Sequence, residues 1–186
     1  MPSAWAAACP SRNVSWIRGM KVLAIDPSLR STGFAVLEET GKGITPVAYG
    51  EIKNARALAV SGCLVAIHDE IVRLIHVHNP ECCAVEAVIY VQSFRTAITL
   101  GAARGAAILA AAGRGLPVYE YAPRRVKQAV VGRGAAVKTQ VSFMVRALLG
   151  LHENPPPDAA DALAVGLAHC QARQAASSGA EPLKPV

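Results

Sequence analysis

The order in which strand-like and helix-like segments follow one another constrains the fold of this chain more than any single motif. Three short strand-like segments come first, and the turn residues Thr40-Gly41-Lys42-Gly43 separate the second from the third. Helix-like and strand-like segments then alternate, and such helical crossovers join parallel strands. The predicted strands span residues 21–26, 33–37, 47–52, 82–88 and 117–121, and the predicted helices span residues 58–75, 96–112, 136–149 and 158–171. We therefore expect an α/β fold with a five-stranded mixed sheet, built from a three-strand antiparallel meander plus two parallel strands, with helices on both faces.

The chain has the size of one domain with a proper core, because it has 186 residues of which 52% are hydrophobic and 17% are charged. Residues 20–172 form the predicted domain, and the Ser-, Gly- and Pro-rich residues 173–186 form a predicted flexible tail. Residues 1–19 lack acids, and we interpret them as an N-terminal extension that is disordered or lies upstream of the true start at Met20; a transit segment is the alternative. The longest apolar runs are too short to cross a bilayer, so we expect no membrane partner.

Five cysteines are present without a C-x-x-C pair, and an odd number fits a disulfide framework poorly. Cys82 and Cys83 lie in an apolar run, where cysteine is typically a small buried hydrophobic residue. We therefore expect a reducing, cytoplasmic setting.

Positive charge is concentrated in one stretch of the chain. Between Arg95 and Arg146 there are nine basic residues and a single acid, Glu120, so this stretch carries more positive charge than the whole chain, whose net charge is +6. Such asymmetry suits a polyanionic partner such as a nucleic acid. A solvated basic face is the alternative interpretation of the charge alone.

Four acids stand out by their positions. Asp26 ends the first predicted strand, and Glu86 lies within or just after the fourth, where an unpaired carboxylate among apolar residues would be costly. Asp158 and Asp161 are three residues apart at the start of a helix and therefore share a face. If the first and fourth strands are neighbours and the last helix docks beside them, all four carboxylates converge.

A cluster of carboxylates without His or Cys predicts Mg²⁺ or Mn²⁺ rather than zinc. Two such ions would clamp the attacking and leaving oxygens of a phosphodiester. Three of the acids also have a structural alternative, whereas Asp161 is harder to explain in this way because its neighbours are apolar. Asp26 could cap a turn, Glu86 could pair with an arginine, and Asp158 could favour the positive end of the helix dipole.

Several segments, taken in chain order, match one known family. They are Leu23-Ala-Ile-Asp26-Pro27 with Thr32-Gly33, Ala84-Val-Glu86, Leu100-Gly-Ala-Ala-Arg104-Gly105, the basic segment from Tyr121 to Gly132 with Lys138-Thr-Gln-Val, and Asp158-Ala-Ala-Asp161-Ala-Leu-Ala. Together they span about residues 21 to 171 and make the chain resemble the RuvC Holliday junction resolvases.

The resemblance implies a ribonuclease H-like fold and a homodimer that binds a four-way DNA junction and nicks two strands of like polarity symmetrically. It implies two Mg²⁺ ions per active site, a water nucleophile, nicks with a 5′-phosphate and a 3′-hydroxyl, and a branch-migration complex of RuvA and RuvB as partner. The implied metal ligands and catalytic residues are Asp26, Glu86, Asp158 and Asp161. The implied DNA-contacting residues are Lys127 and Lys138, to which the basic stretch adds Arg95 and Arg124.

The chain departs from the family pattern at two places. Ser28 stands where the family commonly has glycine after Asp-Pro, so we expect a tighter or reshaped turn. Ile89 stands where the family places an aromatic residue that stacks on a base near the crossover, and Tyr90 follows it. Either Tyr90 takes over the stacking or Ile89 acts as an apolar wedge.

Two other functions are compatible with the same residues. The first is a different ribonuclease H-like nuclease that acts on RNA or simple branched DNA with the same acids. The second is a DNA-binding module without catalysis, in which the acids are only structural. The presence of all four acids disfavours a binding module, because such a module gains by losing charges that repel phosphate.

Overall fold

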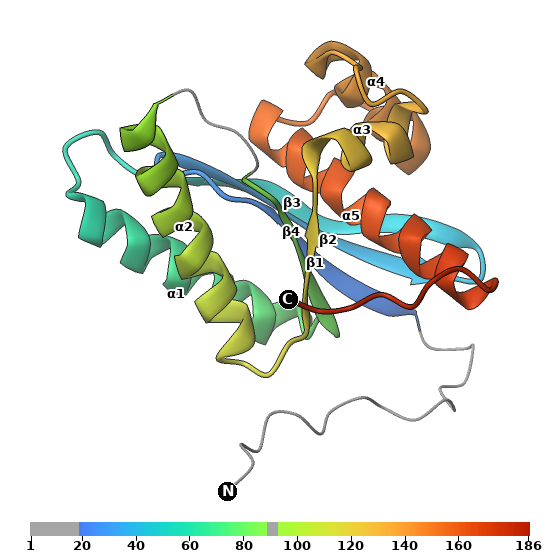
Figure 1. The fold of residues 1–186 in the computed structure, drawn as a ribbon, viewed down its shortest axis with the longest axis horizontal. Helices are drawn as coiled ribbons and strands as arrows, with labels where there is room; N and C mark the ends of the chain where they lie inside the picture. Colours follow the sequence, from blue (N-terminus) through green and yellow to red (C-terminus); the bar gives the residue numbers. More distant parts are fainter. Residues whose placement is uncertain (1–18, 89–92) are drawn as a thin grey trace, which may run out of the picture.

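The computed structural model describes residues 19–88 and 93–186, so Ile89, Tyr90 and nearly all of the predicted N-terminal extension lie outside the described residues. A five-stranded sheet with the order β3-β2-β1-β4-β5 forms its centre (Figure 1). The strands are β1 (Met20–Asp26), β2 (Ser31–Thr40), β3 (Gly43–Lys53), β4 (Cys82–Glu86) and β5 (Val118–Tyr121).

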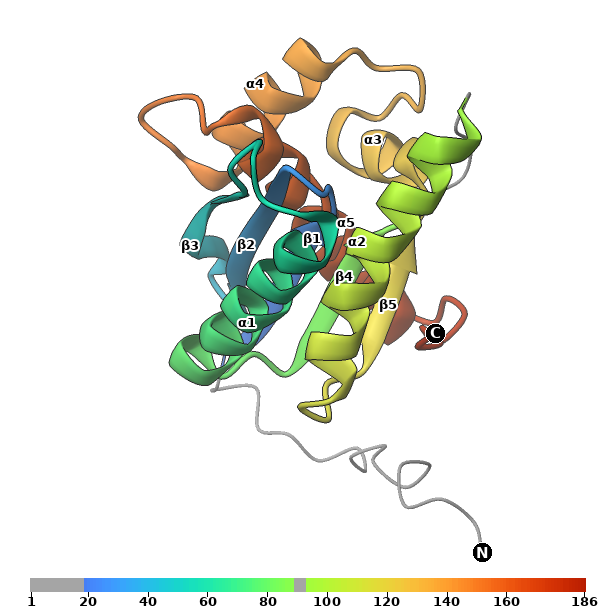
Figure 2. The same cartoon turned by 90° about the vertical axis from the view of Figure 1, so that its left-hand side faces the viewer.

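The pairing of the strands confirms the predicted mixed sheet. β1, β2 and β3 form the antiparallel meander, and β4 and β5 continue the sheet in parallel on the other side of β1. The helix α1 (Val60–His78) connects β3 to β4, and α2 (Phe94–Ala112) connects β4 to β5. Both helices cover the same face of the sheet, where they lie side by side (Figure 2).

The alternation of side chains along each strand divides the core into two layers. On β1, Leu23 and Ile25 pack with α1 and α2, whereas Val22 and Ala24 pack with the last helix on the opposite face. This helix, α5 (Pro157–Ser177), crosses the sheet diagonally and is buried at every position from 159 to 170 except Asp161 (Figure 1). Helices therefore cover both faces, as predicted.

One helix was not expected from the sequence. The segment Pro123–Val131 forms α3, which begins with proline and ends at Gly132 in the left-handed conformation. Only Val126 and Val130 are buried on it, so its apolar pattern is too short to reveal a helix. The next helix, α4 (Lys138–Leu149), begins two residues later than residue 136, where we expected it.

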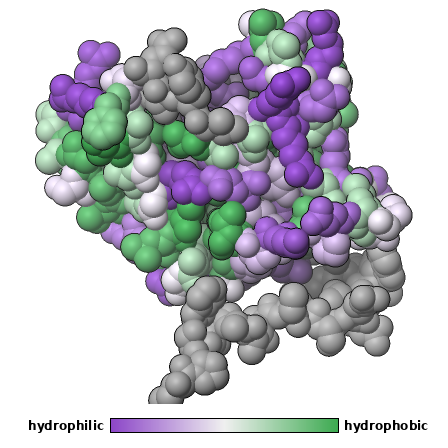
Figure 3. Space-filling model, viewed as in Figure 1, coloured by the Kyte–Doolittle hydropathy of each residue, from purple (hydrophilic) through white to green (hydrophobic). Residues whose placement is uncertain are grey.

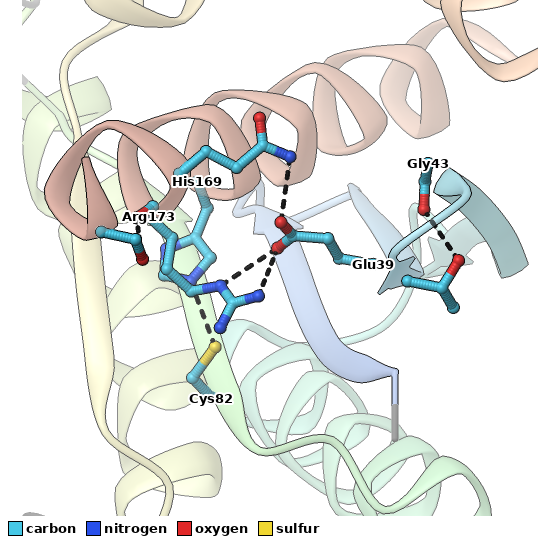
Figure 4. A network of polar contacts seen from close by, with 8 residues as sticks. Glu39, Gly43, Cys82, His169 and Arg173 are labelled. Atoms are coloured by element: carbon cyan, nitrogen blue, oxygen red, sulfur yellow. Dashed lines mark hydrogen bonds and ion pairs between the residues drawn. The ribbon is translucent and has the colours of Figure 1, made fainter. Parts of the chain in front are cut away.

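A polar network fixes the C-terminal half of α5 on the sheet (Figure 4). Glu39 of β2 is largely buried and accepts two hydrogen bonds from Arg173, at 2.7 and 3.0 Å, and one from Gln174 at 2.9 Å. His169 lies nearby, 3.3 Å from the Cys82 sulfur through Nε2. These contacts hold the helix against the sheet as far as Gln174, just beyond residue 172, the predicted end of the domain.

The helix α5 ends at Ser177, beyond the predicted end at residue 171. The chain then returns to β5, where the backbone N–H of Val186 donates a hydrogen bond to the carbonyl oxygen of Val118 at 2.9 Å. Within residues 19–88 and 93–186, no helix has the length and apolar character needed to cross a membrane.

Candidate metal centre

Two of the four predicted acids end neighbouring parallel strands. Asp26 is the last residue of β1 and Glu86 is the last residue of β4. Because side chains alternate along a strand, Asp26 continues the row of Val22 and Ala24 and faces α5. Glu86 occupies the equivalent position on β4. Parallel strands thus bring two carboxyl groups to one edge of the sheet.

The other two acids come from the start of α5. Pro157 is the first residue of this helix, so Asp158 lies in its first turn and Asp161 follows on the same face. Carboxylate oxygens of Asp26, Asp158 and Asp161 all lie within 4.8 Å of one another. Glu86 adjoins this trio, because its carboxyl group is hydrogen-bonded to that of Asp26. The structure therefore brings all four predicted acids together.

A glycine on β2 permits this convergence. Gly33 lies opposite Asp26 in the antiparallel pair of β1 and β2. A Cβ atom placed on Gly33 would lie 1.9 Å from the carbonyl oxygen of Asp158, far closer than any side chain can approach. The first turn of α5 therefore rests directly on the backbone of β2. This contact explains why the motif Thr32-Gly33 has glycine at its second position.

The turn that carries Ser28 is stabilised by the neighbouring threonine. The Ser28 amide donates to the Thr32 hydroxyl at 3.2 Å, and this hydroxyl donates to the Ser28 carbonyl oxygen at 2.5 Å. Ser28 does not adopt a positive φ, so the turn accepts a side chain at this position.

Burial raises the pKa values of both strand-end acids. It is the largest cause of shifts that bring the pKa of Asp26 to about 6 and the pKa of Glu86 to about 8. Repulsion by neighbouring carboxylates adds to both shifts, and the charge of Lys138 opposes them. In the metal-free protein, burial and repulsion therefore favour the protonated form of Glu86 beside the Asp26 carboxylate.

Lys138 lies within the acidic cluster itself. Its Nζ atom is 2.8 Å from Oδ2 of Asp161, and 78% of its side chain is exposed. We predicted a DNA-contacting role for this residue, and the structure shows a lysine that also offsets the negative charge of the acids. An exposed lysine is free to turn away when another cation enters.

The other basic residues that we predicted to contact DNA lie around the same end of the sheet. Arg95 is exposed in the first turn of α2, Arg124 is exposed on α3, and Lys127 on α3 is half-buried. Figures 1 and 2 show α3, α4 and the start of α2 at the end of the sheet where β1 and β4 terminate. Hydrophilic side chains gather over α3 and α4 (Figure 3).

Two residues at the site lie outside the predicted sets of metal ligands and DNA-contacting residues. The Ser31 hydroxyl donates a hydrogen bond to Oδ2 of Asp158, and Oε1 of Glu51 accepts one from the Asp158 backbone N–H at 3.3 Å. Neither residue interrupts a strong apolar run. The sequence does show an acid, Glu51, near the end of the third predicted strand. Whether this acid faces the site depends on the register of that strand, which the sequence does not give.

The four acids fit a hard divalent cation. Their ligand atoms are all carboxylate oxygens, which suit Mg²⁺ and Mn²⁺, and the spacing of the trio matches a shared ion. Burial, and then repulsion between the neighbouring carboxylates, raises the pKa values of Asp26 and Glu86, and a bound cation would relieve that repulsion. A bound cation would replace the proton that Glu86 holds.

Comparisons with known proteins agree with this arrangement. The family model described as crossover junction endodeoxyribonuclease RuvC matches residues 22–169. The crossover junction endodeoxyribonuclease RuvC of Akkermansia muciniphila is 55% identical over 150 residues, which cover 81% of this chain and 90% of that protein. The structure of T. thermophilus RuvC in complex with a Holliday junction substrate is 33% identical, with a TM-score of 0.81 over 90% of this chain and 99% of that one.

A more distant structure shares only the fold. The yeast mitochondrial Holliday junction resolvase Ydc2 is 10% identical, with a TM-score of 0.55 over 88% of this chain and 82% of that one. The sheet order, the helices on both faces and the acids at the ends of β1 and β4 define a ribonuclease H-like protein with an acidic centre. Within this class, the chain belongs to the RuvC family of crossover junction endodeoxyribonucleases.

Proposed function

We propose that this protein is an endonuclease that resolves four-way DNA junctions in recombination and repair by metal-dependent hydrolysis of phosphodiester bonds. Its membership of a family named for cleavage at crossover junctions supports this substrate. So does its similarity to a RuvC structure in complex with a Holliday junction substrate. The observation that carries the proposal is the trio of Asp26, Asp158 and Asp161, whose oxygens lie within 4.8 Å of one another.

The proposed cofactor is a pair of Mg²⁺ ions, for which Mn²⁺ substitutes, held by Asp26, Glu86, Asp158 and Asp161. When bound, such ions activate water and neutralise the charge that develops on the leaving oxygen. The chain holds the carboxylates on rigid elements, two at strand ends and two on a helix. Glu86 would hold the metal in its ionised form.

We propose that the reaction leaves nicks that can be ligated. The oxygen of water gives up a proton to solvent and forms a bond to phosphorus, while the bond between phosphorus and the 3′ oxygen breaks and this oxygen takes up a proton. The products are a 5′-phosphate and a 3′-hydroxyl. The positive charge of Lys138 would lie close to the negative charge of the reacting phosphate, because its exposed side chain reaches Asp161 at 2.8 Å.

Basic residues at the same end of the sheet would hold the DNA backbone. Arg95, Arg124 and Lys127 come from helices that flank the metal centre, and each phosphate that they neutralise releases counterions. We also propose that Ile89 or Tyr90 contacts bases at the crossover, because they follow Glu86 by only three and four residues in the chain.

Two symmetric nicks need two metal centres, and we propose a homodimer that forms through α2. An uncharged exposed stripe runs along this helix at spacings of three and four residues, formed by Phe94, Ile98, Gly101, Gly105 and Leu109. The two glycines have open space in front of them, so a second helix could approach closely. Figure 3 shows hydrophobic residues on the side of the molecule where α1 and α2 lie. Exposed apolar stripes of this kind mark protein interfaces.

The proposed partner in the cell is the branch-migration complex of RuvA and RuvB. The proposed setting is the cytoplasm, where thiols stay reduced. In agreement, the cysteines at positions 63, 82, 83 and 170 are free and buried.

The test uses the full chain with a labelled synthetic four-way junction, in the presence and absence of Mg²⁺. Linear duplex and the variant Asp158→Asn serve as controls. We expect paired symmetric nicks on the junction alone, dependent on Mg²⁺ or Mn²⁺ and lost in the variant.

Two results would replace this proposal with another function. Cleavage of RNA or simple branched DNA in preference to the junction would indicate a different ribonuclease H-like nuclease. Tight junction binding without cleavage in either metal, over several junction sequences, would indicate a binding module.

A further inference from the structure

Asp158 differs from the other acids because two side chains of the sheet hold it. The hydroxyl of Ser31 donates to its Oδ2 atom, and Oε1 of Glu51 accepts from its backbone N–H at 3.3 Å. One contact orients the carboxylate and the other fixes the backbone that carries it. Asp158 is therefore held both at its carboxylate and at its backbone.

The register of the meander places both contacts next to the metal centre. Glu51 of β3 lies opposite Gly33 of β2, and Gly33 lies opposite Asp26 of β1. Glu51 thus shares a cross-strand row with Asp26 on the face that α5 covers. Ser31 begins β2, two residues before Gly33, and therefore faces the same side.

The start of α5 needs a hydrogen-bond acceptor from elsewhere in the chain. Pro156 at the N-cap position makes no side-chain capping bond, and Pro157 has no backbone N–H. Asp158 therefore carries the first backbone N–H of the helix, and the Glu51 carboxylate accepts a hydrogen bond from it. The negative charge of Glu51 also suits the positive end of the helix dipole. Only 9% of the Glu51 side chain is exposed, and its second oxygen pairs with Lys53 at 2.8 Å.

We propose that Ser31 and Glu51 are positioning residues that set the orientation of Asp158 toward the divalent cation. This inference rests on the proposed metal-dependent function. The body of α5 is buried along residues 159–170 independently of these contacts, so their loss would loosen the ligand and leave the fold intact. Groups that orient a ligand in this way typically change metal affinity by about 10–100-fold.

The test measures Mn²⁺ binding to the full chain without DNA, by the electron paramagnetic resonance signal of free Mn²⁺. We expect Ser31→Ala and Glu51→Ala each to raise the Kd for Mn²⁺ by about 10-fold. Ser31→Thr keeps the hydroxyl and Glu51→Gln keeps an acceptor, so both should stay within about threefold of the wild type. The melting temperatures of the metal-free variants should change by less than about 4 °C.

Lys53→Gln is the matched control, because it removes the outer partner of Glu51 and leaves both hydrogen bonds to Asp158 in place. The loss of a positive charge near Asp158 favours a cation, so its Kd for Mn²⁺ should be no higher than that of the wild type. Alanine variants that bind Mn²⁺ like the wild type would overturn the proposal. So would a Glu51→Gln variant as weak as Glu51→Ala, which would show that Glu51 acts only through its charge. If the wild type itself binds no Mn²⁺, the proposed function fails as well. If only Asp158→Asn loses binding, the positioning proposal fails alone.

Discussion

At the residue scale, Glu86 and His169 make stability depend on pH in opposite directions. Burial lowers the pKa of His169 to about 4 from 6.5, so the unfolded chain binds more protons there and stability rises with pH across this window. Burial raises the pKa of Glu86 to about 8 from 4.5, so the folded protein holds the extra proton and stability falls as pH rises through that window. The two effects oppose each other below pH 6.5.

Above pH 6.5, the effect of Glu86 remains. We expect the free energy of unfolding of the metal-free protein to fall between pH 6.5 and 8, by at most about 1.4 kcal/mol per pH unit for one proton. Urea unfolding in EDTA measures this slope. Saturating Mg²⁺ should remove it, because the cation replaces the proton. A Glu86→Gln variant with the slope of the wild type would contradict the assignment.

At the element scale, the close approach of α5 to β2 depends on a missing side chain. We expect Gly33→Ala to lower the free energy of unfolding by about 1–3 kcal/mol, because its Cβ would meet the Asp158 carbonyl at 1.9 Å and displace the first turn of α5. Chemical denaturation of the metal-free protein tests this. Gly41→Ala is the control, because open space surrounds Gly41, and it should change stability by less than about 0.5 kcal/mol. Equal effects of the two variants would refute the explanation.

The elements that sequence reasoning found are those whose own residues carry a long pattern. The apolar runs at residues 21–26 and 82–88 predicted both strands, and the helical crossovers predicted that the sheet contains parallel strands. The structure ends the second of these strands at Glu86 and pairs it with the first. The same reasoning missed α3, because only Val126 and Val130 are buried on it. It also missed the role of Glu51, which depends on the register of β3 against β2 and on the docking of a helix that follows about a hundred residues later.

At the scale of the whole molecule, the exposed stripe on α2 predicts the surface through which two copies of the chain form a dimer. Leu109 on this stripe is 65% exposed, and Val65 on α1 is 59% exposed. We expect Leu109→Arg to convert a dimer into a monomer, because it places a charge in an apolar interface. Analytical ultracentrifugation at micromolar concentration measures the mass. Val65→Arg should leave the dimer intact, and a wild-type protein that is monomeric at all concentrations would refute the proposed interface.

The acidic trio joins the first strand of the domain to its last helix. Asp26 precedes Asp158 by more than a hundred residues, and their oxygens meet only after α5 has settled on the sheet. A nascent chain on the ribosome therefore has no complete cluster until its final helix has emerged. A fragment cut short by proteolysis or a premature stop before residue 157 lacks two of the four acids. The order of elements thus withholds the complete acidic cluster until α5 has been made and has packed on the sheet.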